Sequence, residues 1–429
     1  MHDFADRLEA LLSSRHRPTP DPSVEKRVRD IVSAVQTQGD PALVALTNEL
    51  DRCDVRSMSD LVVDRDERRR AMKDVGAQTI EDLELAAKRI EAFHRRQQES
   101  SWSIETPDGV RLAQRLVPLR RVGVYVPGGT AAYPSSVLMN VVPARVAGVE
   151  DIVMVTPTPD GVISPAVLAA AEIAGVDQLI RIGGAQAIAA LAYGTATVPR
   201  VDKIVGPGNQ WVATAKRQVF GVVDIDMIAG PSELCVVATA DGGASPAQLA
   251  ADLLSQAEHD PLAMVTFISP DAALIERVRE AIQTQLVTLP RQAIAQEAIA
   301  NHSCTIAVES VAEALSIAEQ IAPEHLELVI PDAEAHAELL RNAGAIFCGP
   351  HTPEAIGDYI AGPNHVLPTN GTARFSSALG VYDFVKRVNL IRFSEKALQS
   401  LGPATIRLAE LEGLSGHAES VRKRLKPRE

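Results

Sequence analysis

The sequence predicts an α/β protein built on parallel sheets, and two observations carry this prediction. From residue 122, Val- and Ile-rich runs alternate with Ala-rich helical stretches, as in "VGVYV", "DIVMV", "QLIRI" and "DKIV". A second series alternates in the same way, with strand-like runs at "LCVVAT", "MVTFIS", "CTIAV", "LELVI" and "AIFCG". Continuous apolar strands separated by helices are typical of parallel sheets that helices cover on both faces. We therefore expect two α/β units in one chain.

The segments outside these two series have different patterns. We expect helices over residues 3–14, from 24 with a break at Asp40 and Pro41, and over 66–97. The stretch "SWSIETPDGVRLAQRLVPL" alternates around a Pro-Asp-Gly turn and predicts a two-stranded hairpin. The last fifty residues give one strand-like run, "RVNLIRF", and charged helices that are too few to bury a core. We expect this tail to pack on another part, such as a second subunit.

Composition limits the partners and the compartment. The 42 Lys and Arg against 55 Asp and Glu give a net charge of −13, which argues against nucleic acid or an anionic membrane as the main partner. A small-molecule substrate is expected instead. The 4 cysteines occur singly without CxxC spacing, which favours a reduced, cytoplasmic setting. No stretch approaches the length of a membrane span, so we expect neither a signal peptide nor an anchor.

Three glycine-bearing loops follow strands of the first series: "VPGGTAAYPSS", "RIGGAQA" and "IVGPGNQ". The carboxyl ends of parallel strands meet at one edge of a sheet, so these loops are expected to form one crevice. Glycine also lets backbone N–H groups approach a phosphate. Each loop alone is compatible with a plain turn, and none is a GxGxxG. Together they favour a nucleotide site at this edge.

Two stretches of the second series carry polar residues that suit chemistry. In "LLSQAEHDP", Gln256 and His259 lie three apart at a helix end and could present ligands to one ion; a solvated helix end is the alternative. In "IAPEHLEL", Pro323 ends a helix and places Glu324 and His325 before a strand. An adjacent acid and imidazole could share proton transfer, whereas the alternative is an exposed dipeptide.

Two later stretches add candidates that are each compatible with a structural role. The long loop "GDYIAGPNHVLPTNGTARFSS" carries Asp358, which could be an oxygen ligand, and His365, which could bind a substrate. The tail stretch "EGLSGHAES" holds Glu412 and His417 around two glycines, where a plain helix-helix turn is the alternative.

At these residues the sequence resembles the histidinol dehydrogenase family. The resemblance runs from about residue 122 to 417 through "VYVPGGTAAYPSSVLMN", "IGGAQAIAALAYGT", "GPGN", "AGPSE", "LLSQAEHD", "APEHLEL", "GPNHVLPT", "TARFSSALGVYDF" and "GLSGHA". It implies two incomplete Rossmann-like, aldehyde-dehydrogenase-like units, one inserted in the other, in an intertwined homodimer. The implied domains are an N-terminal helical segment (1–24), a zinc and substrate domain (25–121 with 233–380), an inserted NAD domain (122–232) and a tail that reaches the partner (381–429). The first hundred residues match only loosely.

The resemblance also implies an activity and its residues. One zinc ion per subunit would be held by Gln256, His259, Asp358 and His417 of the partner subunit. The catalytic pair would be Glu324 and His325. Substrate contacts would add Ser232, His365 and Glu412 of the partner subunit to the zinc ligands and Glu324, and NAD contacts would be Tyr125, Gln186 and Asn209. The implied reaction is the last step of histidine biosynthesis, in which L-histidinol is oxidised through its aldehyde to L-histidine while two NAD are reduced.

Roles for the pair follow from the same resemblance. His325 would remove the alcohol proton, Glu324 would activate water to hydrate the aldehyde, and His325 would act again as base. One alternative is a related dehydrogenase of another small alcohol, such as a sulfonated diol, against which His365 and Glu412 argue. Another is a zinc-dependent nucleotide-binding or assembly protein without catalysis, against which the complete residue set argues.

Overall fold

The computed structural model describes residues 21–128 and 132–425, so the helix expected over 3–14 lies outside the described residues. Contacts divide the chain into a larger unit, Met1–Gln97 with Leu119–Phe384, and a smaller unit, Gln98–Pro118 with Val385–Glu429. Of the helices in the described ranges, none has the length and apolar character needed to cross a membrane.

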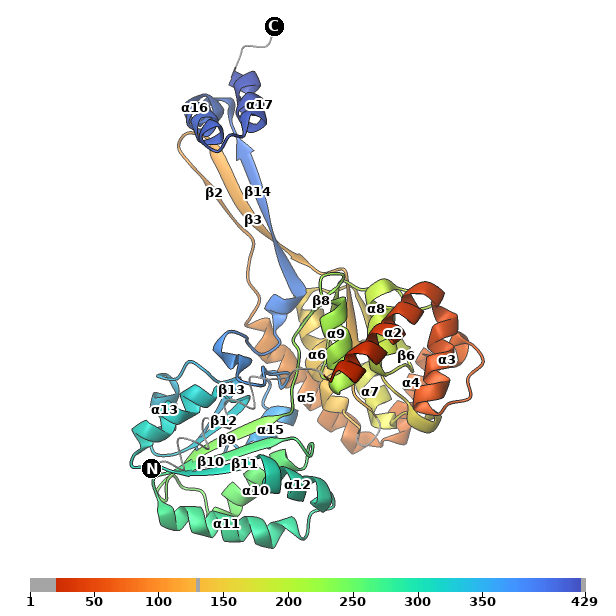
Figure 1. The fold of residues 1–429 in the computed structure, drawn as a ribbon, viewed down its shortest axis with the longest axis vertical. Coiled ribbons are helices and arrows are strands. Elements are labelled where there is room, and N and C mark those ends of the chain that lie inside the picture. The colour runs from red at the N-terminus through yellow and green to blue at the C-terminus, as the bar shows by residue number, and fades with distance from the viewer. Residues whose placement is uncertain (1–20, 129–131, 426–429) are drawn as a thin grey trace. The chain divides into compact units, whose positions relative to one another are not determined.

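A six-stranded sheet, to which β6 and β8 in Figure 1 belong, forms the first half of the larger unit. Its strand order is β1-β6-β5-β4-β7-β8. Its strands are β1 (Val62–Val63), β4 (Arg121–Tyr125), β5 (Asp151–Val155), β6 (Gln178–Ile180), β7 (Lys203–Val205) and β8 (Asp224–Ile225). All neighbours pair in parallel except β1, which runs antiparallel to β6. The parallel sheet predicted from the first series is therefore confirmed.

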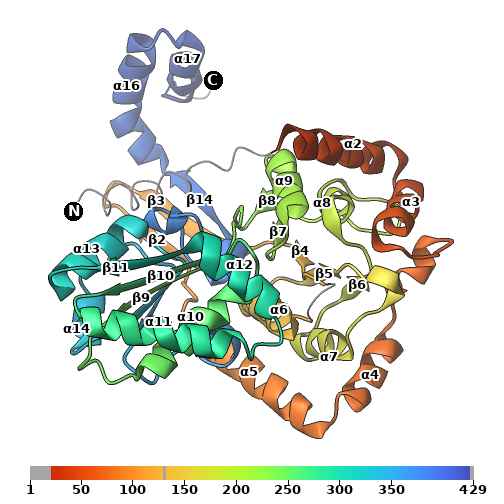
Figure 2. The ribbon, with the colours of Figure 1, turned by 60° about the horizontal axis from the view of Figure 1, so that its bottom comes forward.

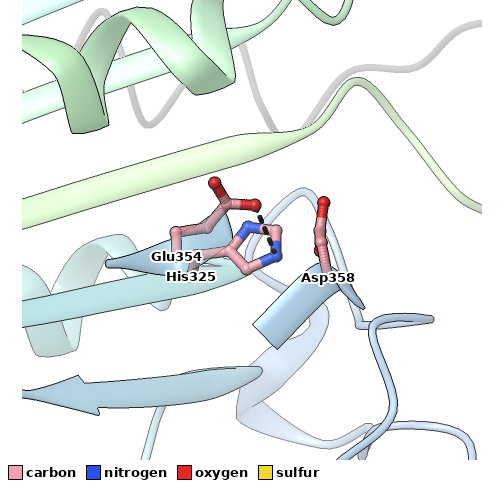
Figure 3. A group of neighbouring side chains, drawn as sticks. All are labelled: His325, Glu354 and Asp358. Carbon is pink, nitrogen blue, oxygen red and sulfur yellow. Dashed lines mark ion pairs between the residues drawn. The ribbon is translucent and has the colours of Figure 1, made fainter. Parts of the chain in front are cut away.

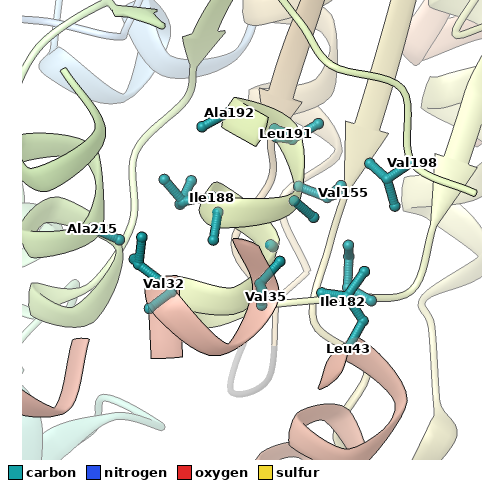
Figure 4. Packing of buried hydrophobic residues seen from close by; sticks show 14 of the residues in the cluster. Val32, Val35, Leu43, Val155, Ile182, Ile188, Leu191, Ala192, Val198 and Ala215 are labelled. Atoms are coloured by element: carbon teal, nitrogen blue, oxygen red, sulfur yellow. The ribbon is translucent and has the colours of Figure 1, made fainter. Parts of the chain in front are cut away.

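Helices cover both faces of this sheet (Figure 2). One face packs against α2 (Pro22–Gln38), α3 (Asp40–Asp51), α8 (Gly184–Tyr193) and α9 (Gln210–Val219). The other packs against α4 (Arg65–Asp74), α5 (Ala77–Arg95), α6 (Pro134–Ala147) and α7 (Pro165–Ala174). Figure 4 shows Val32 and Val35 of α2 in one core with Ile188 of α8 and Val155 of the sheet. This burial of aliphatic side chains is the main stabilising contribution to the sheet.

The N-terminal helices agree with one sequence expectation and differ from two others. The expected single helix over 66–97 is wrong, because Gly76 adopts φ +83° and separates α4 from α5. The expected break before Pro41 is confirmed, with Gly39 at φ +64° between α2 and α3. Residues 24–61 pack on the six-stranded sheet, whereas the sequence analysis grouped 25–121 with 233–380. Helical periodicity shows which residues are buried but not the sheet against which they pack.

A five-stranded sheet forms the second half, with the order β11-β10-β9-β12-β13 and all strands parallel. Its strands are β9 (Glu233–Ala238), β10 (Met264–Ser269), β11 (Ser303–Ala307), β12 (His325–Val329) and β13 (Ala345–Cys348). One face packs against α10 (Pro246–Ala257), α11 (Ala272–Leu286) and α12 (Gln292–His302), and the other against α13 (Val311–Ile321) and α14 (Ala333–Ala337). The short helix α15 (Glu354–Tyr359) follows β13. The second α/β series is therefore confirmed.

The smaller unit is a three-stranded antiparallel sheet with two helices. Its elements are β2 (Trp102–Glu105), β3 (Val110–Pro118), β14 (Val385–Phe393), α16 (Glu395–Leu411) and α17 (Ser415–Leu425). The predicted hairpin is confirmed, and β14 pairs with β3 from Val385 opposite Pro118 to Phe393 opposite Val110. The hairpin and the tail, which the sequence analysis placed in different domains, thus share one sheet. Every residue of β14 after Val385 is exposed, including Leu390 and Ile391.

Candidate active site

A cavity of about 1760 Å³ within the larger unit collects most of the predicted site residues. Its lining includes Asn209, Ser232, His259, Glu324, His325, Asp358 and His365. The six-stranded sheet contributes the loop after β7, at the carboxyl end of that strand. The five-stranded sheet contributes residues at the amino ends of its strands, since Ser232 precedes β9 and His325 begins β12. The cavity therefore lies at opposite strand ends of the two sheets.

The backbone of Glu233 holds both members of the predicted catalytic pair. Its N–H donates to Oε2 of Glu324 at 2.9 Å, and its carbonyl oxygen lies 2.9 Å from Nδ1 of His325. A carbonyl oxygen only accepts, so Nδ1 of His325 is the protonated ring nitrogen. Nε2 is then the basic nitrogen, and it has no hydrogen-bond partner among the described residues. This is the geometry that a general base requires.

Burial shifts the pKa of the two groups in opposite directions. Desolvation lowers the pKa of His325 to about 4; Asp358 opposes this shift, while His259 and His365 add to it. The imidazole is therefore neutral and able to accept a proton at physiological pH. Desolvation also raises the pKa of Glu324 well above its usual range, against the hydrogen bond from the Glu233 N–H. Burial therefore disfavours the ionised form of the Glu324 carboxyl, whereas the hydrogen bond from the Glu233 N–H favours it.

Glu354 joins His325 and Asp358 in a group that the sequence analysis did not predict (Figure 3). Each of the three offers a potential ligand atom, and these atoms lie within 4.8 Å of one another. Glu354 and Asp358 are four residues apart on α15 and so share a face of that helix. Desolvation raises the pKa of Glu354 to about 9, and the charge of Asp358 contributes. The four-residue spacing in "PEAIGDY" predicts that the two carboxylates share a helix face, but it does not show that Glu354 is buried, so the sequence alone does not identify Glu354.

Gln256 is fully buried, and neither polar atom of its amide has a hydrogen-bond partner in the described part of the chain. Its helix, α10, is joined to α15 by Ser255, whose Oγ donates to Oε2 of Glu354 at 3.3 Å. His259 follows the end of α10 and lines the cavity. A buried amide without partners is costly unless a ligand satisfies it. Amide, imidazole and carboxylate donors gathered here fit a divalent metal such as zinc.

The remaining predicted substrate residues of the larger unit also face the cavity. Ser232 directly precedes Glu233, and His365 lies in the loop after α15. That loop is fastened by the N–H of Asn370, which donates to Oε1 of Glu233 at 2.9 Å. Nε2 of His365 is shielded from solvent and has no hydrogen-bond partner within residues 21–128 and 132–425. It is therefore available to a ligand in the cavity.

The three predicted cofactor residues lie at the carboxyl edge of the six-stranded sheet. Tyr125 ends β4 and accepts a hydrogen bond from the N–H of Gly184 at 3.2 Å, and desolvation raises its pKa to about 12. Gln186 is buried in the first turn of α8, and its Oε1 has no partner among the residues described. Asn209 caps α9. The three loops thus lie at one edge of the sheet, as the sequence predicts. Their role in binding a cofactor remains a prediction.

Close packing explains two glycines of these loops. A Cβ on Gly128 would lie 2.7 Å from the carbonyl oxygen of Pro157, and a Cβ on Gly183 would lie 2.3 Å from Cβ of Pro157. Both distances are shorter than van der Waals contact, so a side chain at either position would push the loops apart.

Glu412 and His417 belong to the smaller unit. Glu412 follows the last residue of α16, His417 lies in the first turn of α17, and both are exposed. Their predicted contribution to the site of a partner subunit remains a prediction.

Comparison with known proteins decides the family. The sequence model of the family described as histidinol dehydrogenase matches residues 14–425. The histidinol dehydrogenase of Pseudomonas syringae pv. syringae is 53% identical over 423 residues, which cover 99% of this chain and 94% of the relative. The chain belongs to the histidinol dehydrogenase family.

Other relatives agree with this assignment. The histidinol dehydrogenase of Nitrosospira multiformis is 52% identical over 98% of this chain and 94% of its own length. The crystal structure of histidinol dehydrogenase from Elizabethkingia anophelis superposes with a TM-score of 0.89 at 36% identity, covering 95% of this chain and 93% of that one. The family match begins at residue 14 and so includes most of the N-terminal hundred residues, which the motifs matched only loosely.

Proposed function

We propose that this chain oxidises L-histidinol through its aldehyde to L-histidine, with NAD as oxidant and one zinc ion per subunit. The orientation of His325 is the observation that carries the proposal. Its Nδ1 is bound to a main-chain carbonyl, and its Nε2 is a neutral base at the wall of the cavity. This reaction is the last step of histidine biosynthesis. The proposal includes a cytoplasmic location.

In the first oxidation, Nε2 of His325 accepts the hydroxyl proton of the alcohol. The depressed pKa keeps the ring unprotonated before the step, and the bond from Nδ1 to the Glu233 carbonyl oxygen stabilises the imidazolium that forms. NAD, when bound, would accept the hydride that leaves the carbon bearing this hydroxyl group. The proton and the hydride thus leave the substrate by separate routes.

In the second oxidation, water must add to the aldehyde carbon before another hydride can leave. Glu324 is proposed to accept a proton from that water, for which its carboxyl must be ionised. Burial disfavours the ionised form, but a positive charge entering the cavity would lower the pKa again. His325, after returning its first proton to solvent, then accepts a hydroxyl proton of the hydrate.

Gln256, His259 and Asp358 are the residues of this chain proposed to hold zinc. Two observations support this set of ligands. The buried amide of Gln256 has no hydrogen-bond partner among the described residues, and Ser255 links α10 to α15 through its hydrogen bond to Glu354. Zinc, when bound, supplies a Lewis acid that can hold the imidazole and amine of histidinol in place. Ser232 and His365 would add hydrogen bonds to the same substrate, and Tyr125, Gln186 and Asn209 would contact NAD.

A homodimer is proposed to complete each site with Glu412 and His417 of the partner subunit. Support comes from the smaller unit, whose β14 leaves Leu390, Ile391 and Phe393 exposed among the described residues. A three-stranded sheet with this much exposed apolar surface is expected to pair with another surface.

One assay tests the proposal. The zinc-loaded protein is supplied with histidinol and NAD, and both NADH and histidine are measured. Two NADH per histidine support the reaction. A tenfold higher specificity constant for a competing diol, about 1.4 kcal/mol in transition-state binding, would favour the related alcohol dehydrogenase instead. Absence of NADH formation in a zinc-loaded dimer would favour a binding protein without catalysis.

A further inference from the structure

Lys216 and Asp226 form a buried ion pair beside the loop that follows β7. Nζ of Lys216 lies 2.6 Å from Oδ1 of Asp226, and the two side chains are only 3% and 1% exposed. Lys216 lies on α9, and Asp226 follows β8. Charges as buried as these are uncommon in proteins, and their removal from water is costly. The pair therefore requires an explanation beyond a surface contact.

The pair binds both the backbone carbonyl oxygen and the backbone N–H of Gly206. Nζ of Lys216 donates to the carbonyl oxygen of Gly206 at 2.6 Å, and the N–H of Gly206 donates to Oδ2 of Asp226 at 2.7 Å. Gly206 has φ +108°, and a Cβ there would lie 2.0 Å from the carbonyl oxygen of Tyr125. The backbone at Gly206 is thus pressed against the end of β4 and fixed there by two charge-assisted hydrogen bonds.

The two segments that the pair joins both line the cavity. Gly206 begins the loop that ends at Asn209, the predicted cofactor contact. Asp226 begins the segment that leads through Ser232 to Glu233, whose backbone orients the catalytic pair. A second hydrogen bond, from the N–H of Met227 to Oδ1 of Asp226 at 2.6 Å, fixes the start of this segment. One ion pair therefore fixes the position of the loop 206–209 relative to the segment 226–233, which leads to the catalytic pair.

We propose that Lys216 and Asp226 are positioning residues for the nicotinamide cofactor. They act through Gly206, by holding the loop to Asn209 in the conformation that binds the dinucleotide. The inference rests on the proposed function, which places NAD at this loop. If the pair served stability alone, replacing it by apolar side chains of similar size would leave the Kd for NADH of the folded protein unchanged.

The test is the double variant K216M/D226L in the full-length, zinc-loaded protein. NADH binding is followed by fluorescence titration in the absence of histidinol. We expect the Kd for NADH to rise tenfold or more, and the KM for NAD to rise in parallel, because the backbone at Gly206 loses both partners. The KM for histidinol should stay within twofold.

Lys203 offers a matched control on the same sheet. It is buried, pairs with Asp224 at 3.1 Å and with Asp383 at 3.6 Å, and makes no hydrogen bond to Gly206 among the described residues. K203M should lower the melting temperature and leave the Kd for NADH unchanged. If K203M weakens NADH binding as much as K216M/D226L does, a general loss of stability explains the effect and the inference is overturned.

A second control separates this inference from the proposed cofactor site. N209S keeps a side chain suited to capping α9 but removes the amide. An unchanged Kd in N209S would place NAD elsewhere and overturn the proposed site. If N209S binds NADH more weakly than the parent but K216M/D226L binds it equally well, only the positioning role is overturned. Should the double variant fail to fold, D226N replaces it, because Lys216 and Gly206 donate to different oxygens of Asp226 and asparagine exchanges one of these oxygens for an NH2 group. Unchanged NADH affinity in D226N overturns the inference as well.

Discussion

Nε2 of His325 faces the carboxyl group of Glu354, with 3.8 Å between Nε2 and Oε1 and no hydrogen bond to either atom among the described residues. The two groups are close enough to form an ion pair when the imidazole is protonated, as the dashed line in Figure 3 marks, but they are too far apart for a hydrogen bond. A proton accepted at Nε2 would therefore find a carboxyl group nearby, while a substrate can still approach the nitrogen. Burial keeps Glu354 neutral in the chain without ligands, so it does not compete for that nitrogen as an ion.

His325→Asn should reduce kcat by about a hundredfold or more, because acid-base groups act in the transition state. The asparagine amide can still donate to the Glu233 carbonyl oxygen, so the backbone should keep its position. Steady-state kinetics and zinc content are the measurements, and zinc content should not change. His351→Asn, at an exposed position outside the cavity lining, is the matched control. Normal turnover in the His325 variant would remove this residue from the mechanism.

Glu324→Gln should also reduce turnover by about a hundredfold or more. Its amide oxygen can still accept from the Glu233 N–H, so the expected loss is chemical. Water is needed only for the second oxidation, so supplied histidinaldehyde should be oxidised as slowly as histidinol. Rapid oxidation of the aldehyde by this variant would contradict the role of Glu324 in activating water.

Gln256→Met should weaken zinc binding and stabilise the metal-free chain. A metal ligand is lost, and a buried amide without partners, which costs about 1–3 kcal/mol, is replaced by an apolar side chain of similar length. Chelator competition measures zinc affinity, and urea unfolding with chelator present measures stability. Gln283→Met, at an exposed position of α11, should change neither quantity. A destabilised metal-free Gln256→Met chain would show that the amide is satisfied in the fold.

Mixing inactive His417→Ala chains with inactive His325→Asn chains should restore activity if sites are shared between subunits. Random exchange makes half of the dimers mixed, and one of the two sites in each mixed dimer has both histidines. About one quarter of parental activity is therefore expected. Mass spectrometry of the intact dimer verifies the exchange. Mixed dimers without activity would place His417 in the site of its own chain.

The buried carboxyl of Glu327 should make the metal-free protein less stable as the pH rises. Desolvation raises its pKa to about 8, and the charge of Asp252 adds to the shift. The folded chain therefore binds a proton that the unfolded chain has released between about pH 4.5 and pH 8, so the free energy of unfolding falls as pH increases through this window.

Glu327→Gln removes that titration. Relative to the parent, the variant should gain about 3 kcal/mol between pH 5.5 and pH 8.5 in urea unfolding with chelator present. Glu280→Gln, at an exposed position of α11, should follow the parent curve. Parallel curves for the parent and Glu327→Gln would show that this carboxyl is ionised in the fold.

The strands and the catalytic pair were predictable because their signals are local. Apolar runs marked nine of the parallel strands, and Pro323 marked the loop that carries Glu324 and His325 into β12. The partners of those strands were less predictable, since the pairing of β14 with β3 joins residues about 270 positions apart in sequence. Local patterns contain no information about such a distant register.

The site contained features that no spacing rule would select. Glu354 resembles any acidic residue at a helix start, and only burial against Asp358 and His325 distinguishes it. Lys216 and Asp226 are likewise ordinary surface residue types until the fold buries them. Charged residues are predicted to be exposed by default, so sequence reasoning misses the few that are buried.

The support that Glu233 gives to the catalytic pair has a practical consequence for mutagenesis. Both hydrogen bonds come from main-chain atoms, so an alanine scan cannot detect them: every replacement except proline at position 233 keeps its N–H and its carbonyl. Exchanging the amide nitrogen for an ester oxygen by semisynthesis would remove one of the two hydrogen bonds without introducing a proline ring. Libraries built to change substrate preference can therefore vary those cavity-lining residues that have no proposed role, provided that the backbone at residue 233 keeps its position.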